Sequence, residues 1–222
     1  MSINIAVDGP AGAGKSTIAK KLAKELAFVY VDTGAMYRAM ALYFLNQKIA
    51  SDDEAAISAA CADVEITIRY ENGEQQVLLN GENVNGQIRR EEVGNMASAT
   101  SVYPEVRKKL VELQKALAVQ TDVIMDGRDI GTCVLPDAQV KIYLTASVET
   151  RAKRRFDELQ EKGADCNLEE IKADIADRDY RDMHREISPL KQADDAVLVD
   201  SSEMTIDEVV TAIRKIYEEK CR

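Results

Sequence analysis

Short apolar runs alternate with helical patterns along most of this chain. Each run is followed by polar residues or glycine, and the runs occupy residues 3–7, 28–31, 123–127, 140–147 and 196–202. Between them apolar residues recur at helical spacing, most clearly in a stripe over residues 206–217. Strands that alternate with helices favour a parallel sheet covered on both faces. We therefore predict an α/β fold with a five-stranded parallel sheet flanked by helices.

The segment 63–95 departs from this rhythm. Val64, Ile66 and Ile68 alternate with polar residues, and the dipeptides Asn72-Gly73 and Asn80-Gly81 follow. Strict alternation with Asn-Gly turns is typical of short antiparallel hairpins. We predict an insert with a small antiparallel sheet inside a single domain spanning 1–222. It is either a decorative excursion or a mobile flap that serves a second substrate.

Composition narrows the class of protein. The chain has 222 residues and 45% hydrophobic content, which suits one globular domain.

No run of about 18 apolar residues occurs and the N-terminus lacks a basic region, so we expect a cytoplasmic protein with no membrane partner. The four cysteines are scattered without a CxxC pair, which favours reduced thiols over a metal site or disulfides. We expect a monomer.

The charge distribution points to a local anion site. A net charge of −10 argues against binding to the nucleic-acid backbone. The second half of the chain nevertheless concentrates arginines: Arg128, Arg151, Arg154, Arg155, Arg178, Arg181 and Arg185.

A glycine-rich loop lies between the first predicted strand and helix. GPAGAGKS matches G-x-x-x-x-G-K-[ST], whose backbone N–H groups curl around phosphate oxygens at a helix N-terminus. Lys15 would neutralise the β- and γ-phosphates, and the Ser16 hydroxyl would ligate Mg²⁺. We expect nucleoside triphosphate to be bound by Gly9, Pro10, Ala11, Gly12, Ala13, Gly14, Lys15, Ser16 and Thr17.

The loop alone does not distinguish hydrolase, switch and kinase. The sequence lacks an Asn-Lys-x-Asp run, which weakens the GTPase hypothesis, and an LSGGQ-like signature, which weakens the transporter hypothesis. A small-molecule kinase is favoured. The alternatives are a related kinase that acts on another small phosphorylated acceptor, and an ATP-driven switch or binding module.

VDTGAMYR follows the second predicted strand. Arg38 there can hold an acceptor phosphate bidentately, or it is a solvated arginine on a helix face. Asp32 either organises Mg²⁺ and its waters or caps the following helix.

DGRDIGT, residues 126–132, follows the apolar strand VIM. Its polar residues therefore project at the carboxyl end of the sheet, where ligands of open α/β folds bind. Arg128 and Asp129 together can hold a phosphate and a base amino group.

These motifs, with the later RDYRDMHRE, resemble those of the bacterial cytidylate kinases, nucleoside monophosphate kinases that move the γ-phosphate of ATP onto CMP or dCMP. The resemblance covers essentially the whole chain, including the antiparallel insert. It implies the P-loop nucleoside monophosphate kinase fold, a monophosphate-binding insert at 63–95, a helical lid at 152–187 and Mg²⁺ with ATP.

The resemblance also implies roles for individual residues. Arg38, with Thr33 nearby, would hold the CMP phosphate, and Ser98, Arg107 and Asp129 would read cytosine. A carboxylate suits the N4 amino group of cytosine, whereas uracil offers O4 in that place. Ser98 and Arg107 are otherwise ordinary polar residues of helices.

The lid segment carries arginines at helical spacing. Arg178, Arg181, Asp182 and Arg185 would share one helix face. A second such face on the preceding helix would carry Arg151, Arg154 and Arg155. These arginines either pair with Asp174 and Asp177 or neutralise the transferring phosphoryl group. The family implies that Arg178, Asp182 and Arg185 reach CMP. The residues that we expect to act in catalysis are Lys15, Arg128, Arg154, Arg178 and Arg185.

Overall fold

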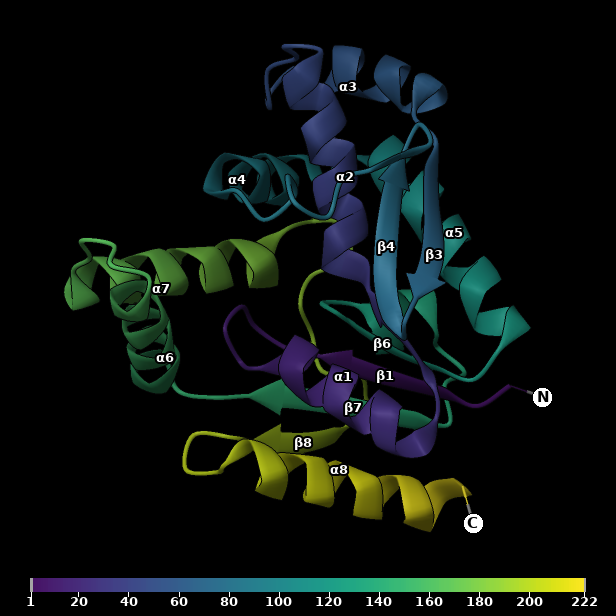
Figure 1. Ribbon diagram of the computed structural model, residues 1–222, viewed down its shortest axis with the longest axis vertical. Coiled ribbons are helices and arrows are strands. Elements are labelled where there is room, and N and C mark those ends of the chain that lie inside the picture. Colours follow the sequence, from purple (N-terminus) through teal and green to yellow (C-terminus); the bar gives the residue numbers. More distant parts are fainter. Residues whose placement is uncertain (1, 222) are drawn as a thin grey trace. The chain divides into compact units, whose positions relative to one another are not determined.

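A computed structural model describes residues 2–221, and its arrangement is shown in Figure 1. The five apolar runs form one parallel sheet with the strand order β2-β6-β1-β7-β8. The predicted α/β fold is confirmed. The strands are β1 (Asn4–Asp8), β2 (Val29–Asp32), β6 (Val123–Gly127), β7 (Val140–Thr145) and β8 (Val197–Asp200).

Local capping sets where several helices begin. The side chains of Asp32, Ser147 and Asn167 accept hydrogen bonds from backbone N–H groups at the starts of α2, α6 and α7. The helices are α1 (Lys15–Leu26), α2 (Thr33–Asn46), α3 (Glu54–Ala60), α4 (Glu91–Thr100), α5 (Pro104–Gln120), α6 (Val148–Glu161), α7 (Leu168–His184) and α8 (Ile206–Cys221). A 3₁₀ turn, η1 (Cys61–Asp63), and a π-helical turn, η2 (Ile130–Val134), complete the elements.

The predicted antiparallel sheet is confirmed. It consists of β3 (Ile66–Glu71), β4 (Glu74–Leu79) and β5 (Glu82–Asn83). Both Asn-Gly dipeptides connect its strands. Asn72 and Gly73 have φ of 53° and 78°, and Asn80 and Gly81 have φ of 49° and 87°. Two successive positive φ values define the type I′ geometry that matches the twist of a hairpin, and Asn-Gly accommodates it best.

The chain divides into two units, which we name the loop unit and the insert unit. The loop unit comprises Ile3–Phe28 and the chain from Val123 onward, and the insert unit comprises Val29–Asp122. In the loop unit α1 packs on β6 and beside α8, while α6 packs beside α7 (Figure 1). Asp8, the last residue of β1, pairs with Gly127 on one side and Tyr143 on the other. The carboxyl ends of these strands therefore form one edge.

The insert unit is built around α2. This helix packs against α4, α5, β3 and β4, and its apolar side chains Met36, Met40 and Phe44 are fully buried. Gln75 of β4 bonds both the backbone N–H and the carbonyl of Asp32, which ties the antiparallel sheet to the start of α2. Along residues 2–221 no helix has both the length and the apolar character needed to cross a membrane.

Candidate active site

The glycine loop follows β1 and leads into α1, as the motif requires. Gly9 has φ of 150°, and a Cβ there would lie 1.9 Å from the Leu144 carbonyl oxygen, so only glycine fits against β7. Gly12 and Gly14 have φ of 77° and 87°. Gly14 immediately precedes α1, so the loop presents its amides together with the positive end of the helix dipole.

Lys15 is buried within this loop. Its Nζ donates a hydrogen bond of 2.7 Å to the Pro10 carbonyl. Burial lowers the pKa of the Lys15 ammonium well below its ordinary value, and the nearby Arg128 charge acts in the same direction. A bound phosphate would supply the anion that this buried cation favours.

Ser16 contributes to a group of oxygen atoms in the site. Its hydroxyl, in the first turn of α1, donates a hydrogen bond of 2.8 Å to Asp126 Oδ2 on β6. A hydroxyl and a carboxylate at this separation are the oxygen donors that Mg²⁺ prefers, with phosphates and waters completing its shell. Among residues 2–221 no three His, Cys, Asp or Glu side chains are grouped to hold a metal alone. Sequence reasoning missed Asp126 as a site residue, although its place at the end of a buried strand signalled it.

Asp8 was missed as well. Its carboxylate accepts hydrogen bonds of 2.7 Å from both the Ile130 and Gly131 amides. Burial raises the pKa of Asp8 to about 6, because desolvation outweighs these two amide bonds. A Cβ at Gly131 would lie 3.3 Å from Asp8 Oδ2 and 3.2 Å from Lys141 Cδ. Asp8 lies at the end of the strand that leads into the glycine loop. Through these two amides it anchors the turn on which Arg128 and Asp129 lie.

Arg128 pairs with the lid segment. Its Nε donates a hydrogen bond of 2.9 Å to Asp182 Oδ2 on α7, and both side chains are largely buried. Burial opposes ionisation of Asp182, but the charges of Arg128, Arg178 and Arg185 hold its pKa below the ordinary value. Four of the side chains expected to contact CMP therefore interact within the loop unit.

The expectation that Arg185 shares a helix face with Arg178 is wrong in detail. α7 ends at His184, and Arg185 has an extended backbone with φ of −65° and ψ of 143°. Its Nε donates to the Ser188 carbonyl at 2.7 Å, and its Nη2 lies 3.8 Å from Asp129 Oδ1. The helix end redirects Arg185 toward the DGRDIGT turn, a contact that helical periodicity did not predict.

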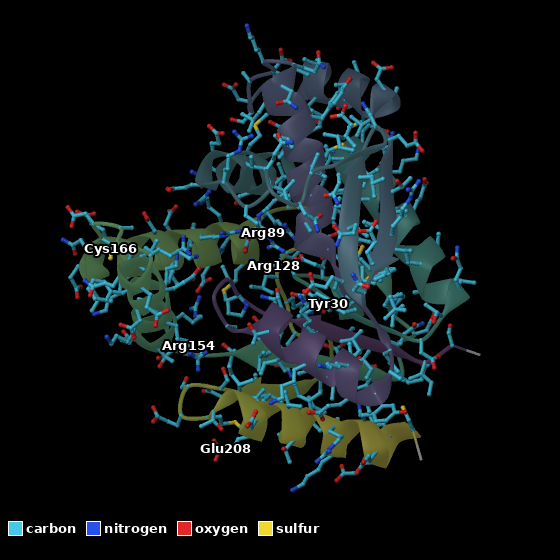
Figure 2. All side chains as sticks on the ribbon, in the orientation of Figure 1. Tyr30, Arg89, Arg128, Arg154, Cys166 and Glu208 are labelled. Carbon is cyan, nitrogen blue, oxygen red and sulfur yellow. The ribbon has the colours of Figure 1, made fainter. Side chains whose placement is uncertain are left out.

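Arg181 and the arginines of α6 differ in their surroundings. Arg154, labelled in Figure 2, is exposed and donates to the Ser201 carbonyl at 2.7 Å. Arg181 forms an exposed ion pair of 2.9 Å with Asp177, which is the simple helix-surface alternative. Arg151, in contrast, is buried.

The insert unit gathers the remaining predicted CMP contacts. Thr33 is buried at the start of α2, and Arg38 lies five residues further along this helix. A Cβ at Gly34 would lie 3.3 Å from Arg38 Nη1, so the glycine makes room for the guanidinium. Arg107 is buried on α5 and donates from Nη1 to the Tyr37 hydroxyl at 3.3 Å. Ser98 lies half-buried on α4.

Asp32 has two partners in the insert unit. Its Oδ1 accepts the Ala35 N–H at 2.9 Å, which is the helix cap that the sequence left open. Its Oδ2 accepts a hydrogen bond of 2.8 Å from Nη2 of Arg89. Arg89 is labelled in Figure 2. Its predicted role toward Mg²⁺ stays a prediction.

Comparison with known proteins identifies the family. The sequence profile described as "Cytidylate kinase" matches residues 5–219. The chain belongs to the cytidylate kinase family. It is 51% identical to the cytidylate kinase of Lactobacillus johnsonii over 218 residues, which cover 98% of this chain and 95% of the relative. It is 49% identical to that of a Geobacillus species over 219 residues, which cover 99% of this chain and 98% of the relative. The prediction of a kinase is confirmed.

A solved structure supports the fold. The crystal structure of an uncharacterized protein from Eubacterium ventriosum matches with a TM-score of 0.55 and 14% identity, covering 99% of each chain. At this identity the match concerns the fold alone.

Proposed function

We propose that this cytidylate kinase family member transfers the γ-phosphate of ATP directly to CMP and dCMP, giving CDP and dCDP. The observation that carries the proposal is the roughly half-identical match to curated cytidylate kinases over nearly the full length of both chains. We further propose that the enzyme acts as a monomer in the cytoplasm, a compartment in which its cysteines would stay reduced.

The donor nucleotide would bind to the glycine loop of the loop unit. The backbone N–H groups of residues 9–17, Pro10 excepted, would donate hydrogen bonds to the phosphate oxygens. The Lys15 ammonium would move from the Pro10 carbonyl to the β- and γ-phosphate oxygens. Lys15→Ala should therefore remove most turnover with every acceptor.

Mg²⁺ would be held by Ser16, with Asp126 supporting it through the hydroxyl or a bound water. The ion neutralises charge on the β- and γ-phosphates when it is bound. Both oxygen donors are already adjacent, so this chain's own residues orient the site before the nucleotide arrives.

The acceptor would be recognised by the residues that the family resemblance implies. Asp129 would accept a hydrogen bond from the cytosine N4 amino group. Arg107 and Ser98 would donate hydrogen bonds to the O2 and N3 acceptors. Arg38, with Thr33, would bind the phosphate. Burial of Asp129 and Arg107 supports base discrimination, because a mismatched base would leave a buried polar group without its partner.

Arg128 and the arginines of the lid would stabilise the transfer. Arg128, Arg154, Arg178 and Arg185 would neutralise charge that spreads over the phosphoryl oxygens, with no covalent enzyme intermediate. Asp182 holds Arg128 in place and would itself bind the sugar of CMP. Exclusion of water by the lid would favour transfer over hydrolysis.

A coupled assay of ADP release from Mg-ATP with a panel of nucleoside monophosphates tests the proposal. We expect stimulation by CMP and dCMP and little by AMP or GMP. An ATP-driven switch would instead hydrolyse ATP at a rate indifferent to the acceptor, which would refute the proposal.

A further inference from the structure

Arg151 is a buried arginine at which three elements of the loop unit meet. It lies in the first turn of α6 and is only 3% exposed. Its Nε donates to the Ala146 carbonyl at 2.9 Å, just after β7. Its Nη1 donates to the Ala11 carbonyl of the glycine loop, also at 2.9 Å. Both of its terminal nitrogens bond the Asp179 carboxylate on α7, at 3.1 and 2.5 Å.

These bonds use most of the donor capacity of the side chain. A guanidinium has five N–H groups in a fixed planar fork, and the bidentate pair with Asp179 neutralises its charge. Arg151 is therefore not arranged as a phosphate ligand, although its spacing placed it on the arginine face with Arg154. Its geometry suits a residue that acts through its neighbours.

The bond to Ala11 fixes one peptide of the glycine loop. In a trans peptide the carbonyl and the following N–H point in opposite directions, and no cis peptide occurs among residues 2–221. A carbonyl of Ala11 directed at Arg151 thus turns the Gly12 N–H away from Arg151. Gly12 has φ of 77°, and a Cβ there would lie 3.5 Å from Arg151 Cβ. The loop and α6 are in close contact at this peptide.

The bond to Asp179 reaches the lid helix. Asp179 is adjacent in sequence to Arg178 and precedes Asp182 by three residues, one helical turn. Asp182 is anchored in turn by Arg128. The part of α7 that carries predicted CMP contacts is therefore held by the same guanidinium that orients the glycine loop.

We propose that Arg151 is a positioning residue that, together with Asp179, sets the Ala11–Gly12 peptide for the triphosphate and couples α7 to the glycine loop. Occupation of the loop and the position of the lid helix then depend on each other, so ATP and CMP bind with positive coupling. The predicted coupling between ATP and CMP binding rests on the proposed function, whereas the predicted effect of Arg151 on the glycine loop does not.

The test compares Arg151→Met, Arg151→Lys and the double variant Arg151→Met/Asp179→Leu with the wild type. A buried ion pair replaced by apolar side chains of similar volume usually preserves folding, so the double variant separates positioning from stability. Lysine keeps the charge but loses the fork. The matched control is Lys153→Met/Asp157→Leu, which removes an exposed pair on the same helix.

The first measurement is ADP affinity by calorimetry without any acceptor. We expect about 10- to 100-fold weaker binding in the folded double variant and in Arg151→Lys, as when a supporting residue of a binding site is lost, with wild-type affinity in the control. A double variant that folds and binds ADP like the wild type overturns the proposal.

The second measurement is CMP affinity with and without a non-hydrolysable ATP analogue. The wild type should bind CMP more tightly with the analogue than without it. In the double variant the two CMP affinities should be equal. If the double variant shows the same ratio of CMP affinities with and without the analogue as the wild type, the proposed coupling is overturned. Failure of the wild type to bind CMP would instead refute the proposed function, and the ADP result would still decide the role of Arg151.

Discussion

The Ser16 hydroxyl donates a hydrogen bond of 2.8 Å to Asp126 Oδ2, which links the first turn of α1 to the end of β6. If this pair supports Mg²⁺, Asp126→Asn should raise the Mg²⁺ concentration needed for half-maximal activity by about 10- to 100-fold. A titration of activity against Mg²⁺ at fixed ATP measures this. Asp157→Asn, at an exposed position on α6, is the control, and an unchanged Mg²⁺ requirement in Asp126→Asn would contradict the assignment.

Asp129 is buried, and Arg185 Nη2 lies 3.8 Å from its carboxylate. Asp129→Ala should lower kcat/KM for CMP relative to UMP by roughly 1–3 kcal/mol, because the cytosine amino group loses its acceptor. The ratio of kcat/KM for the two substrates is the measurement, and ADP affinity checks that the donor site is intact. Equal losses toward both pyrimidines would remove Asp129 from base recognition.

The two roles considered for Asp32, helix capping and metal binding, can be distinguished by experiment. Both carboxylate oxygens already have partners, Ala35 N–H and Arg89, so we expect Asp32→Ala to reduce the free energy of unfolding by about 1 kcal/mol. Asp32→Asn retains a capping oxygen and should lose less. Urea unfolding and the Mg²⁺ requirement are measured on both variants. A shifted Mg²⁺ requirement with unchanged stability would favour the metal role.

Gly9→Ala should be poorly tolerated. The new Cβ would lie 1.9 Å from the Leu144 carbonyl oxygen, and a backbone atom of a central strand cannot move aside cheaply. We expect a loss of about 1–3 kcal/mol or more in the free energy of unfolding, together with weaker ADP binding. Gly73→Ala is the matched control, since its φ is also positive but no atom lies within 4 Å of the added carbon. Similar losses in both variants would show that backbone strain, rather than the clash, decides.

The carboxyl group of Asp8 predicts a pH effect in the ligand-free protein. Its pKa is raised to about 6 in the folded state from 3.8, so the folded state binds the extra proton. The resulting stabilisation is complete below the unfolded pKa and is lost as pH rises through about 6. The stability of the wild type minus that of Asp8→Asn should fall by about 1 kcal/mol between about pH 5.5 and 7.5. Urea unfolding at several pH values measures it, and a difference that is flat or rises with pH would contradict the shift.

Several features followed from sequence because their causes are local. The Asn-Gly dipeptides determined the hairpin turns, since few other residues adopt two successive positive φ values. The glycine loop was predicted with its strand and helix, because its backbone geometry depends on Gly9, Gly12 and Gly14. The apolar runs likewise identified the strands, because short continuous apolar runs followed by polar residues or glycine are typical of buried parallel strands.

Other features were decided only by the tertiary structure, because their partners are far apart in the chain. Asp8 meets amides more than 120 residues away, and Arg151 meets the Ala11 carbonyl across 140 residues. Periodicity assigns a residue to a helix face but does not say whether that face meets solvent, a ligand or another charge. It grouped Arg151 with Arg154, yet packing buried one and left the other exposed. The sequence alone determined the local backbone and the chemistry available, whereas long-range packing determined which charged groups are neutralised within the fold.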